Sequence, residues 1–256
     1  MDLGLEGSTV IVTGSSAGIG RAIAVAFARE RARVAVTYHA DRAGADQTAE
    51  LVRAAGGDPL VVRFALEDPA TAAAVIDAVQ ARWGAPLHAL INNAVFWPGG
   101  FHAVEDLTLE QWRAPVHANI DGTFAMIQAA LPGMRAAPWA RIATISTGLV
   151  IDGFPGSAAY MTGKAALHGL HRTLAKELGP AGILTNVVMA GVVATRERPP
   201  AMVQQMMRSA ATGRMTDADE VARTVVFLGS RANGHITGEA LRCDGFFVSA
   251  VRREAT

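Results

Sequence analysis

A tyrosine and a lysine stand four residues apart in a chain that contains few of either type. The 256 residues include two tyrosines, and only two of the 23 basic residues are lysines, so a chance pairing of Tyr160 with Lys164 is rare. At positions i and i+4 of a helix, two side chains share one face, with Cβ atoms about 5–6 Å apart. A lysine ammonium there stabilises a tyrosinate and lowers the phenol pKa from its ordinary value of about 10. The pair is predicted to act as a general acid and base.

A glycine-rich segment follows the first apolar run of the chain, with Gly14, Gly18 and Gly20 at the spacing G-x-x-x-G-x-G. Glycines at a strand-to-helix turn allow backbone N–H groups to approach a pyrophosphate, and the helix N-terminus favours the anion. Residues 14–18 also match the G-x-S-x-G elbow of serine hydrolases, with Ser16 as the nucleophile. The position after the first predicted strand and the third glycine favour dinucleotide binding, and the hydrolase is kept as an alternative.

Polar side chains lie at three further positions suited to a site. Ser146 ends an apolar run before Tyr160, where its hydroxyl can hydrogen-bond a carbonyl oxygen. Asn119 lies inside a region of helical pattern, which its side chain disfavours unless it has a task such as holding a water at a kink. Asn92 and Ala94 follow another apolar run, and ligands of parallel sheets bind at the carboxyl ends of the strands.

The elements that must position these residues alternate along the chain. Apolar, β-branched runs predict strands at 9–13, 33–38, 60–64, 87–91, 141–146, 183–188 and 240–243. Alanine-rich stretches predict helices at 21–31, 45–55, 69–83, 109–134, 158–178 and 217–228. Such alternation predicts right-handed crossovers and a single α/β domain over residues 1–256, with a doubly wound sheet of about seven parallel strands and helices on both faces. Residues 190–209 lack a clear regular pattern and are a candidate substrate lid.

Charge and cysteine content narrow the classes of partner and compartment. Acidic and basic side chains are balanced at 23 each, which favours neither nucleic acid nor an anionic membrane as a partner. The start of the chain lacks the pattern of a secretory signal, and the single cysteine, Cys243, fits a reducing compartment. Residues 178–195 carry no charge, but glycines and a proline interrupt them, which favours a buried strand over a membrane span. We therefore expect a cytoplasmic protein, and no metal site is predicted.

These residues together resemble the short-chain dehydrogenase/reductase family from Ser8 to about Gly245. The resemblance implies an NAD(P)-dependent oxidoreductase and a homotetramer, for which the long apolar helices predicted at 109–134 and 158–178 also argue. It implies a catalytic tetrad in which Tyr160 exchanges a proton with the substrate oxygen and Lys164 lowers the tyrosine pKa while binding the nicotinamide ribose. Ser146 would orient the carbonyl group, and Asn119 would hold a relay water. The implied cofactor contacts are Gly14, Ser16, Gly18, Ile19, Gly20, Asn92, Ala94, Tyr160, Lys164 and Thr195.

The sequence departs from the family pattern at four positions. Ala65 stands where an aspartate usually meets the adenine, and Val95 replaces a glycine. Ala190 replaces a proline, and Phe246 replaces a second glycine. Apolar side chains that could line a substrate pocket are Phe96, Trp97, Leu149, Phe154, Met202, Met206 and Met207.

The end of the second predicted strand bears on which nicotinamide cofactor is used. A ribose 2′-hydroxyl is best bound by a carboxylate there, whereas a 2′-phosphate needs an arginine. Tyr38 occupies the position where NAD-preferring relatives carry an acid, and Arg42 lies four residues later. Asp41 is a competing carboxylate, and Ala17 lacks the basic side chain of many NADP-preferring relatives. We expect NADP(H) to be favoured over NAD(H).

The predicted activity is that of a ketoreductase or alcohol dehydrogenase. Hydride would pass between the nicotinamide and a ketone or secondary alcohol, with Tyr160 as the general acid or base. A 3-oxoacyl thioester reductase is an alternative, although the bulky Phe96 and Trp97 favour a cyclic or aromatic ketone. An alternative of another class is a nicotinamide-sensing module without turnover.

Overall fold

A computed structural model describes residues 1–193 and 199–246. These residues form a seven-stranded parallel sheet in the order β3-β2-β1-β4-β5-β6-β7. The strand order reverses between β1 and β4, as in doubly wound sheets, so the predicted fold class is confirmed. The strands are β1 (Thr9–Val12), β2 (Arg33–Tyr38), β3 (Asp58–Arg63), β4 (Leu87–Asn92), β5 (Ala140–Thr147), β6 (Ile183–Ala190) and β7 (Ala240–Cys243).

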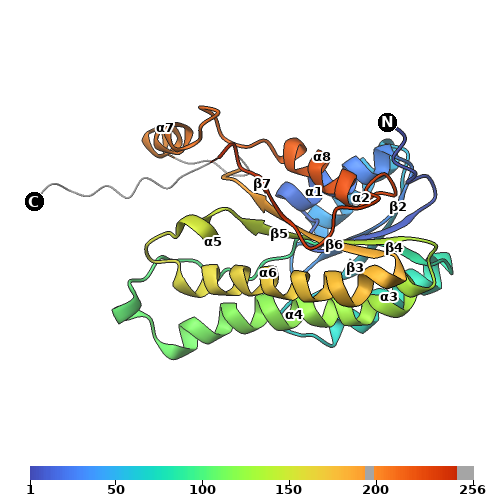
Figure 1. Ribbon diagram of the computed structural model, residues 1–256, viewed down its shortest axis with the longest axis horizontal. Helices are drawn as coiled ribbons and strands as arrows, with labels where there is room; N and C mark the ends of the chain where they lie inside the picture. The colour runs from blue at the N-terminus through green and yellow to red at the C-terminus, as the bar shows by residue number, and fades with distance from the viewer. Residues whose placement is uncertain (194–198, 247–256) are drawn as a thin grey trace, which may run out of the picture.

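Helices cover both faces of the sheet (Figure 1). Helices α1, α2 and α8 lie on one face, and α3, α4 and α6 lie on the other. The α-helices are α1 (Gly18–Arg29), α2 (Arg42–Ala54), α3 (Thr71–Trp83), α4 (Leu109–Arg135), α5 (Leu149–Asp152), α6 (Ala158–Leu178), α7 (Pro200–Ser209) and α8 (Ala218–Leu228). Short 3-10 turns are η1 (Val104–Asp106) and η2 (Gly179–Ala181). Of these described helices, none is long and apolar enough to cross a membrane.

The two hydrophobic layers follow from the alternation of side chains along each strand. In β1, Val10 and Val12 pack toward α1 and α8, whereas Ile11 packs into the opposite layer. All three are fully buried. When both faces of a strand are covered, apolar and polar side chains do not alternate along it. This explains why the strands appear in the sequence as continuous apolar runs.

Two helices begin earlier than the sequence pattern predicts. The glycine turn leads directly into α1, which starts at Gly18 rather than at residue 21. Helix α2 starts at Arg42 rather than at residue 45, because the Asp41 carboxylate accepts a hydrogen bond from the Gly44 N–H group at 2.8 Å and caps the helix. Both changes place polar backbone or side-chain groups close to the carboxyl ends of β1 and β2.

The connection after β6 is more regular than expected. Strand β6 continues to Ala190, which pairs with Thr147 and Cys243. Within residues 190–209, the expected irregular stretch, α7 forms a ten-residue helix that begins with a proline at its first position. Thr195 lies outside the described residues.

Candidate active site

Helix α6 carries Tyr160 and Lys164 on one face, beside the end of β5. Lys164 is 4% exposed, and its Nζ donates a hydrogen bond to the Ile145 carbonyl oxygen at 2.9 Å. Burial lowers the pKa of Lys164 to about 8, because an apolar environment disfavours the charged form. Burial also raises the pKa of Tyr160 to about 12, opposite to the direction expected from the lysine alone. At neutral pH the phenol is therefore protonated and the lysine remains largely charged.

Ser146 lies near the end of β5, one residue after the carbonyl that anchors Lys164. It is buried, and its Oγ is 2.9 Å from Nε2 of His168 on α6. The hydroxyl, the phenol and the ammonium thus come from two neighbouring elements that pack against each other. This arrangement can place a hydrogen-bond donor and a proton donor on the same substrate oxygen.

Asn119 joins α4 to the loop after β4. Its Oδ1 accepts a hydrogen bond from the Phe96 N–H group at 3.0 Å, and its Nδ2 donates to the Phe96 and Pro115 carbonyl oxygens at 2.8 and 2.7 Å. A Cβ atom at Gly163 would lie 3.5 Å from the Asn119 Cβ, so α4 and α6 approach closely next to Lys164. The side chain of Asn119 is therefore hydrogen-bonded to backbone groups of Phe96 and Pro115, and both amide hydrogens of Nδ2 take part in these bonds.

The glycine turn forms one wall of a cavity of about 480 Å³. Helix α1 has Ala17 at its N-cap with no side-chain acceptor, so the N–H groups of its first turn remain available to an anion. A Cβ atom at Gly20 would lie 2.3 Å from the Gly14 carbonyl oxygen, and such a tight turn brings the backbone up to the cavity. The lining residues are Gly14, Ser16, Ala17, Gly18, Ile19, Gly20, His39, Ala40, Asp41, Phe64, Leu66, Glu67, Asn93, Ala94, Val95 and Phe96.

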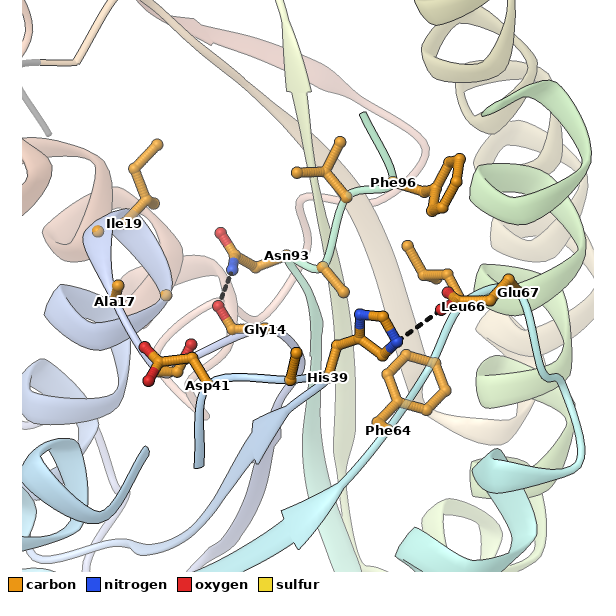
Figure 2. A pocket seen from close by; sticks show the side chains of 16 residues that line it. Gly14, Ala17, Ile19, His39, Asp41, Phe64, Leu66, Glu67, Asn93 and Phe96 are labelled. Atoms are coloured by element: carbon orange, nitrogen blue, oxygen red, sulfur yellow. Dashed lines mark hydrogen bonds and ion pairs between the residues drawn. The ribbon is translucent and has the colours of Figure 1, made fainter. Parts of the chain in front are cut away.

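The turn is tied to the end of β4 by Asn93. Its Nδ2 donates to the Gly14 carbonyl oxygen at 2.9 Å (Figure 2) and to the Thr13 carbonyl oxygen at 2.9 Å. The Thr13 Oγ1 accepts from the Asn93 and Ala94 N–H groups. Asn92, which the sequence singled out, is buried and donates to Thr144 Oγ1 instead. The residues that shape the cavity and fit a bound dinucleotide therefore include Gly14, Gly20, Asn93 and Ala94.

The far end of this cavity holds a close contact between a histidine and a glutamate that the sequence pattern did not reveal. His39 Nε2 lies 2.6 Å from Glu67 Oε1, and both side chains face the cavity (Figure 2). Ala65, where the family carries an aspartate, is buried and bonds through its backbone to Thr71. Any recognition of an adenosine group at this end must therefore come from other side chains.

Tyr38 and Arg42 lie beside this end of the cavity rather than among its lining residues. The Arg42 guanidinium bonds Asp46 at 3.0 and 3.1 Å and lies 5.6 Å from the centre of the Tyr38 ring. Hydrogen bonds to Tyr38 and Asp46 raise the pKa of Arg42 above its ordinary value. Arg42 is mostly exposed, so it can turn toward the cavity if its bond to Asp46 is exchanged.

An aromatic cluster covers Tyr160. The Trp97 ring lies edge-on to Tyr160, with ring centres 4.5 Å apart, and also contacts Phe101 at 5.6 Å. Phe101 contacts Phe154 at 5.3 Å. Trp97 and Phe154 are 38% and 40% exposed, so this cluster offers open aromatic surface next to Tyr160.

The other apolar candidates are distributed more widely. Leu149 begins α5, directly after β5, whereas Phe96 lines the cavity of the glycine turn. Met202 and Met206 lie on α7, and Met207 lines a separate hollow of about 230 Å³ with Gln204, Arg208 and Gly213. The described contacts join Trp97 and Phe154, but not these methionines, to Tyr160.

Two remaining departures from the family pattern alter the edges of the site. Val95 is half exposed and lines the cavity. Phe246 adopts a left-handed φ of 55°, a conformation that glycine adopts without strain and a bulky residue disfavours. Its ring packs under the Arg242 guanidinium at 5.1 Å.

Several residues of the site have no local sequence signal. His39 pairs with Glu67 across two different strand ends, and His168 pairs with Ser146 over 22 positions of chain. Only the position of Asn93, directly after a predicted strand, could have indicated its role.

The sequence is similar to known oxidoreductases over nearly its full length. Residues 14–246 match a family model described as enoyl-(acyl carrier protein) reductase. A 3-oxoacyl-[acyl-carrier-protein] reductase of Pseudomonas aeruginosa is 30% identical over 95% of this chain and 98% of its own. An NADPH-dependent aldehyde reductase-like chloroplast protein of Arabidopsis thaliana is 29% identical over 96% of each chain.

Solved structures show the same fold. The reductase LugOII, which catalyses a keto-reduction in lugdunomycin biosynthesis, superimposes with a TM-score of 0.89 at 34% identity, covering 94% of this chain and 98% of its own. A short-chain dehydrogenase/reductase of Serratia marcescens gives a TM-score of 0.88 at 32% identity, covering 95% and 98%.

Proposed function

Because this chain belongs to the short-chain dehydrogenase/reductase family, we propose that it is an NADP(H)-dependent ketoreductase or alcohol dehydrogenase. The observation that carries the proposal is the placement of Tyr160, Lys164 and Ser146 on the facing ends of α6 and β5, beside the Trp97 ring. Members of this family are nicotinamide-dependent oxidoreductases, and that broader activity follows from the family alone.

The reaction we propose converts a ketone, a proton and NADPH into a secondary alcohol and NADP⁺. A bound nicotinamide supplies the hydride that adds to the carbonyl carbon. Tyr160 Oη gives its proton to the carbonyl oxygen, and the Lys164 ammonium stabilises the tyrosinate that remains. The Ser146 hydroxyl donates a hydrogen bond to the same oxygen. Lys164 would also hold the nicotinamide ribose when the cofactor is bound. Asn119 holds the Phe96 segment in place through its three hydrogen bonds.

The proposal is tested with a panel of ketones. NADPH and NADH are each mixed with the protein and with aliphatic, cyclic, aromatic and 3-oxoacyl thioester substrates, and cofactor oxidation is followed by absorbance. We expect consumption of cofactor with the cyclic and aromatic ketones, because Trp97, Phe101 and Phe154 offer stacking surface beside Tyr160. Preference for the thioester would favour the 3-oxoacyl alternative, to which the P. aeruginosa relative points.

The cofactor specificity is proposed from the end of β2. Asp41 already caps α2, and Tyr38 stands where a carboxylate would face the ribose hydroxyl, so an incoming 2′-phosphate would find the Arg42 guanidinium nearby. The name of the Arabidopsis relative includes NADPH dependence, which supports the same preference.

Arg42→Ala is expected to weaken NADPH binding by about tenfold and to leave NADH binding unchanged, because only the phosphate gains a charge-assisted contact. The dissociation constants of both cofactors are measured by fluorescence. Asp46→Asn is the matched control: it frees Arg42 from its ion pair and should not weaken NADPH. Equal losses for both cofactors, or a wild-type preference for NADH, would show that the assignment is wrong.

A serine hydrolase that uses Ser16 is poorly supported by the geometry. In the turn, φ is positive at Gly14 and Gly18 and not at Ser16, so the serine lacks the strained conformation of a nucleophile elbow. In the described chain the histidine bonded to a serine is His168, and its partner is Ser146.

Ser16→Ala should therefore retain ketone reduction to within about tenfold, since it removes at most one hydrogen bond to the cofactor. Steady-state rates with NADPH provide the measurement. A loss beyond a thousandfold in a variant with an unchanged circular dichroism spectrum would revive the hydrolase alternative.

We further propose that residues 190–209 form a substrate lid, of which residues 194–198 lie outside the described part of the chain. Helix α7 carries exposed Met202 and Met207 and projects from the body of the molecule toward the end where α5 lies (Figure 1). An amphipathic helix after a strand end that borders the site is suited to cover an apolar substrate.

Chain association is expected through the layer of α4 and α6. The exposed Leu109 and Phe124 on α4 leave apolar area on this layer uncovered, and we propose a homotetramer of 26.7 kDa chains in the cytoplasm. Light scattering at micromolar concentration should give the mass of four chains. A monomeric mass would contradict this proposal.

A further inference from the structure

The catalytic serine has a partner that its own role does not require. Ser146 Oγ and His168 Nε2 are 2.9 Å apart. His168 lies four residues beyond Lys164 on α6, so the helix face that presents the lysine also presents the imidazole. The contact connects the two elements that form the site.

A second histidine on α6 makes an equivalent contact with β5, closer to the middle of the sheet. His171 Nε2 lies 2.7 Å from Thr144 Oγ1 on β5, and its Nδ1 contacts Thr185 Oγ1 on β6. Residues three apart on a helix share a face, as do residues two apart on a strand. His168 therefore contacts Ser146, and His171 contacts Thr144. The second contact helps to fix the position of α6 on β5, and thus the position of His168 relative to Ser146.

The surroundings of His168 favour its neutral imidazole. Burial, followed by the nearby positive charges of Arg172 and Lys164, lowers the pKa of His168 below its ordinary value. A neutral imidazole has one N–H group and one acceptor nitrogen. The hydroxyl of Ser146 can therefore meet Nε2 in two ways: it donates to a bare nitrogen, or it accepts from an N–H group.

These two arrangements have opposite consequences for a substrate carbonyl oxygen, which only accepts hydrogen bonds. If Ser146 donates to His168, its single hydrogen is used. If His168 donates to Ser146, that hydrogen remains free. We propose that His168 is a positioning residue whose Nε2–H group donates to Ser146 Oγ, fixing the serine rotamer and directing the hydroxyl hydrogen toward the substrate oxygen. This inference rests on the ketone reduction proposed above.

The kinetic test is a double-mutant cycle. His168→Leu is expected to lower kcat for ketone reduction about tenfold, the effect of one oriented hydrogen bond, with an unchanged Kd for NADPH. In a Ser146→Ala background the same change should cost nothing further, because His168 acts only through that hydroxyl. His168→Gln, whose amide nitrogen can take the place of Nε2, should recover most of the rate. Arg172→Gln, an exposed charge change four residues along α6, should leave the rate unaltered.

A measurement without substrate tests the hydrogen bond itself. Nitrogen-15 shifts of labelled histidine distinguish the two tautomers, and the His168→Gln spectrum assigns the signal. We expect a protonated Nε2 at His168 that shifts in Ser146→Ala. A bare Nε2, or a His168→Leu loss of equal size with and without Ser146, would overturn the inference. A wild type that shows the protonated Nε2 but reduces no ketone would instead contradict the proposed function.

Discussion

Tyr160→Phe is expected to lower kcat for ketone reduction by about a hundredfold to ten thousandfold, the range for loss of a positioned general acid. The change removes one hydroxyl and leaves the ring, so packing against Trp97 at 4.5 Å is kept. The protein environment raises the pKa of Tyr160 to about 12, which keeps the phenol protonated and able to donate at neutral pH.

The loss should fall on the chemical step. NADPH binding should be nearly unchanged, because Tyr160 is not among the residues that line the cavity of the glycine turn. The melting temperature should stay close to that of the wild type. Stopped-flow single turnovers separate chemistry from binding. Activity within tenfold of the wild type would remove Tyr160 from the catalytic assignment. Tyr38→Phe, the same change at the other tyrosine, is the control and should keep the catalytic rate.

Gly20→Ala is expected to destabilise the protein by at least about 3 kcal/mol and to abolish dinucleotide binding. Its new methyl group would lie 2.3 Å from the Gly14 carbonyl oxygen and 2.5 Å from Asn93 Nδ2. Neither neighbour can move without breaking the bonds that tie the turn to β4. The backbone must therefore shift where it faces the cavity.

A second glycine provides a matched control for this substitution. Gly169 lies on α6 and is exposed, and a Cβ atom there would meet no tertiary neighbour within 4 Å among the described residues. Gly169→Ala should stabilise the protein by about 1 kcal/mol, as expected in a helix interior. Thermal melts and NADPH titrations of both variants provide the comparison. A Gly20→Ala protein that binds NADPH with wild-type affinity would contradict the account of the turn.

Local patterns in the sequence were sufficient to predict the sheet and the shared helix face of Tyr160 and Lys164. The apolar runs coincide with strands because both sheet faces are covered, and Tyr160 and Lys164 share a face because helical spacing requires it. The glycine turn was identifiable because its spacing and its place after β1 are properties of a single segment.

The hydrogen bonds at the start of α2 could not be predicted in the same way. Asp41 was expected to compete for the ribose, but the backbone N–H group of Gly44 takes its carboxylate. Arg42 was expected to face the cofactor, and the structure pairs it with Asp46. Such outcomes depend on where a helix begins, which was mispredicted by three residues for α2.

The side chains that close the cavity and support the serine illustrate the same limit. His39 and Glu67 are brought together by two crossover connections, and His168 meets Ser146 through the packing of α6 on β5. A lone histidine carries no spacing signal, so neither partner is indicated before the fold is known.

The central claim is that the protein transfers hydride from NADPH to a ketone. The most direct test uses the best ketone of the panel with NADPH deuterated at C4, one stereoisomer at a time, followed by mass spectrometry of the alcohol. We predict that one of the two labelled cofactors delivers a single deuterium to the carbinol carbon, with one alcohol formed per NADPH oxidised. Binding of NADPH without any labelled alcohol, across the whole panel, would contradict the account and favour a nicotinamide-sensing module.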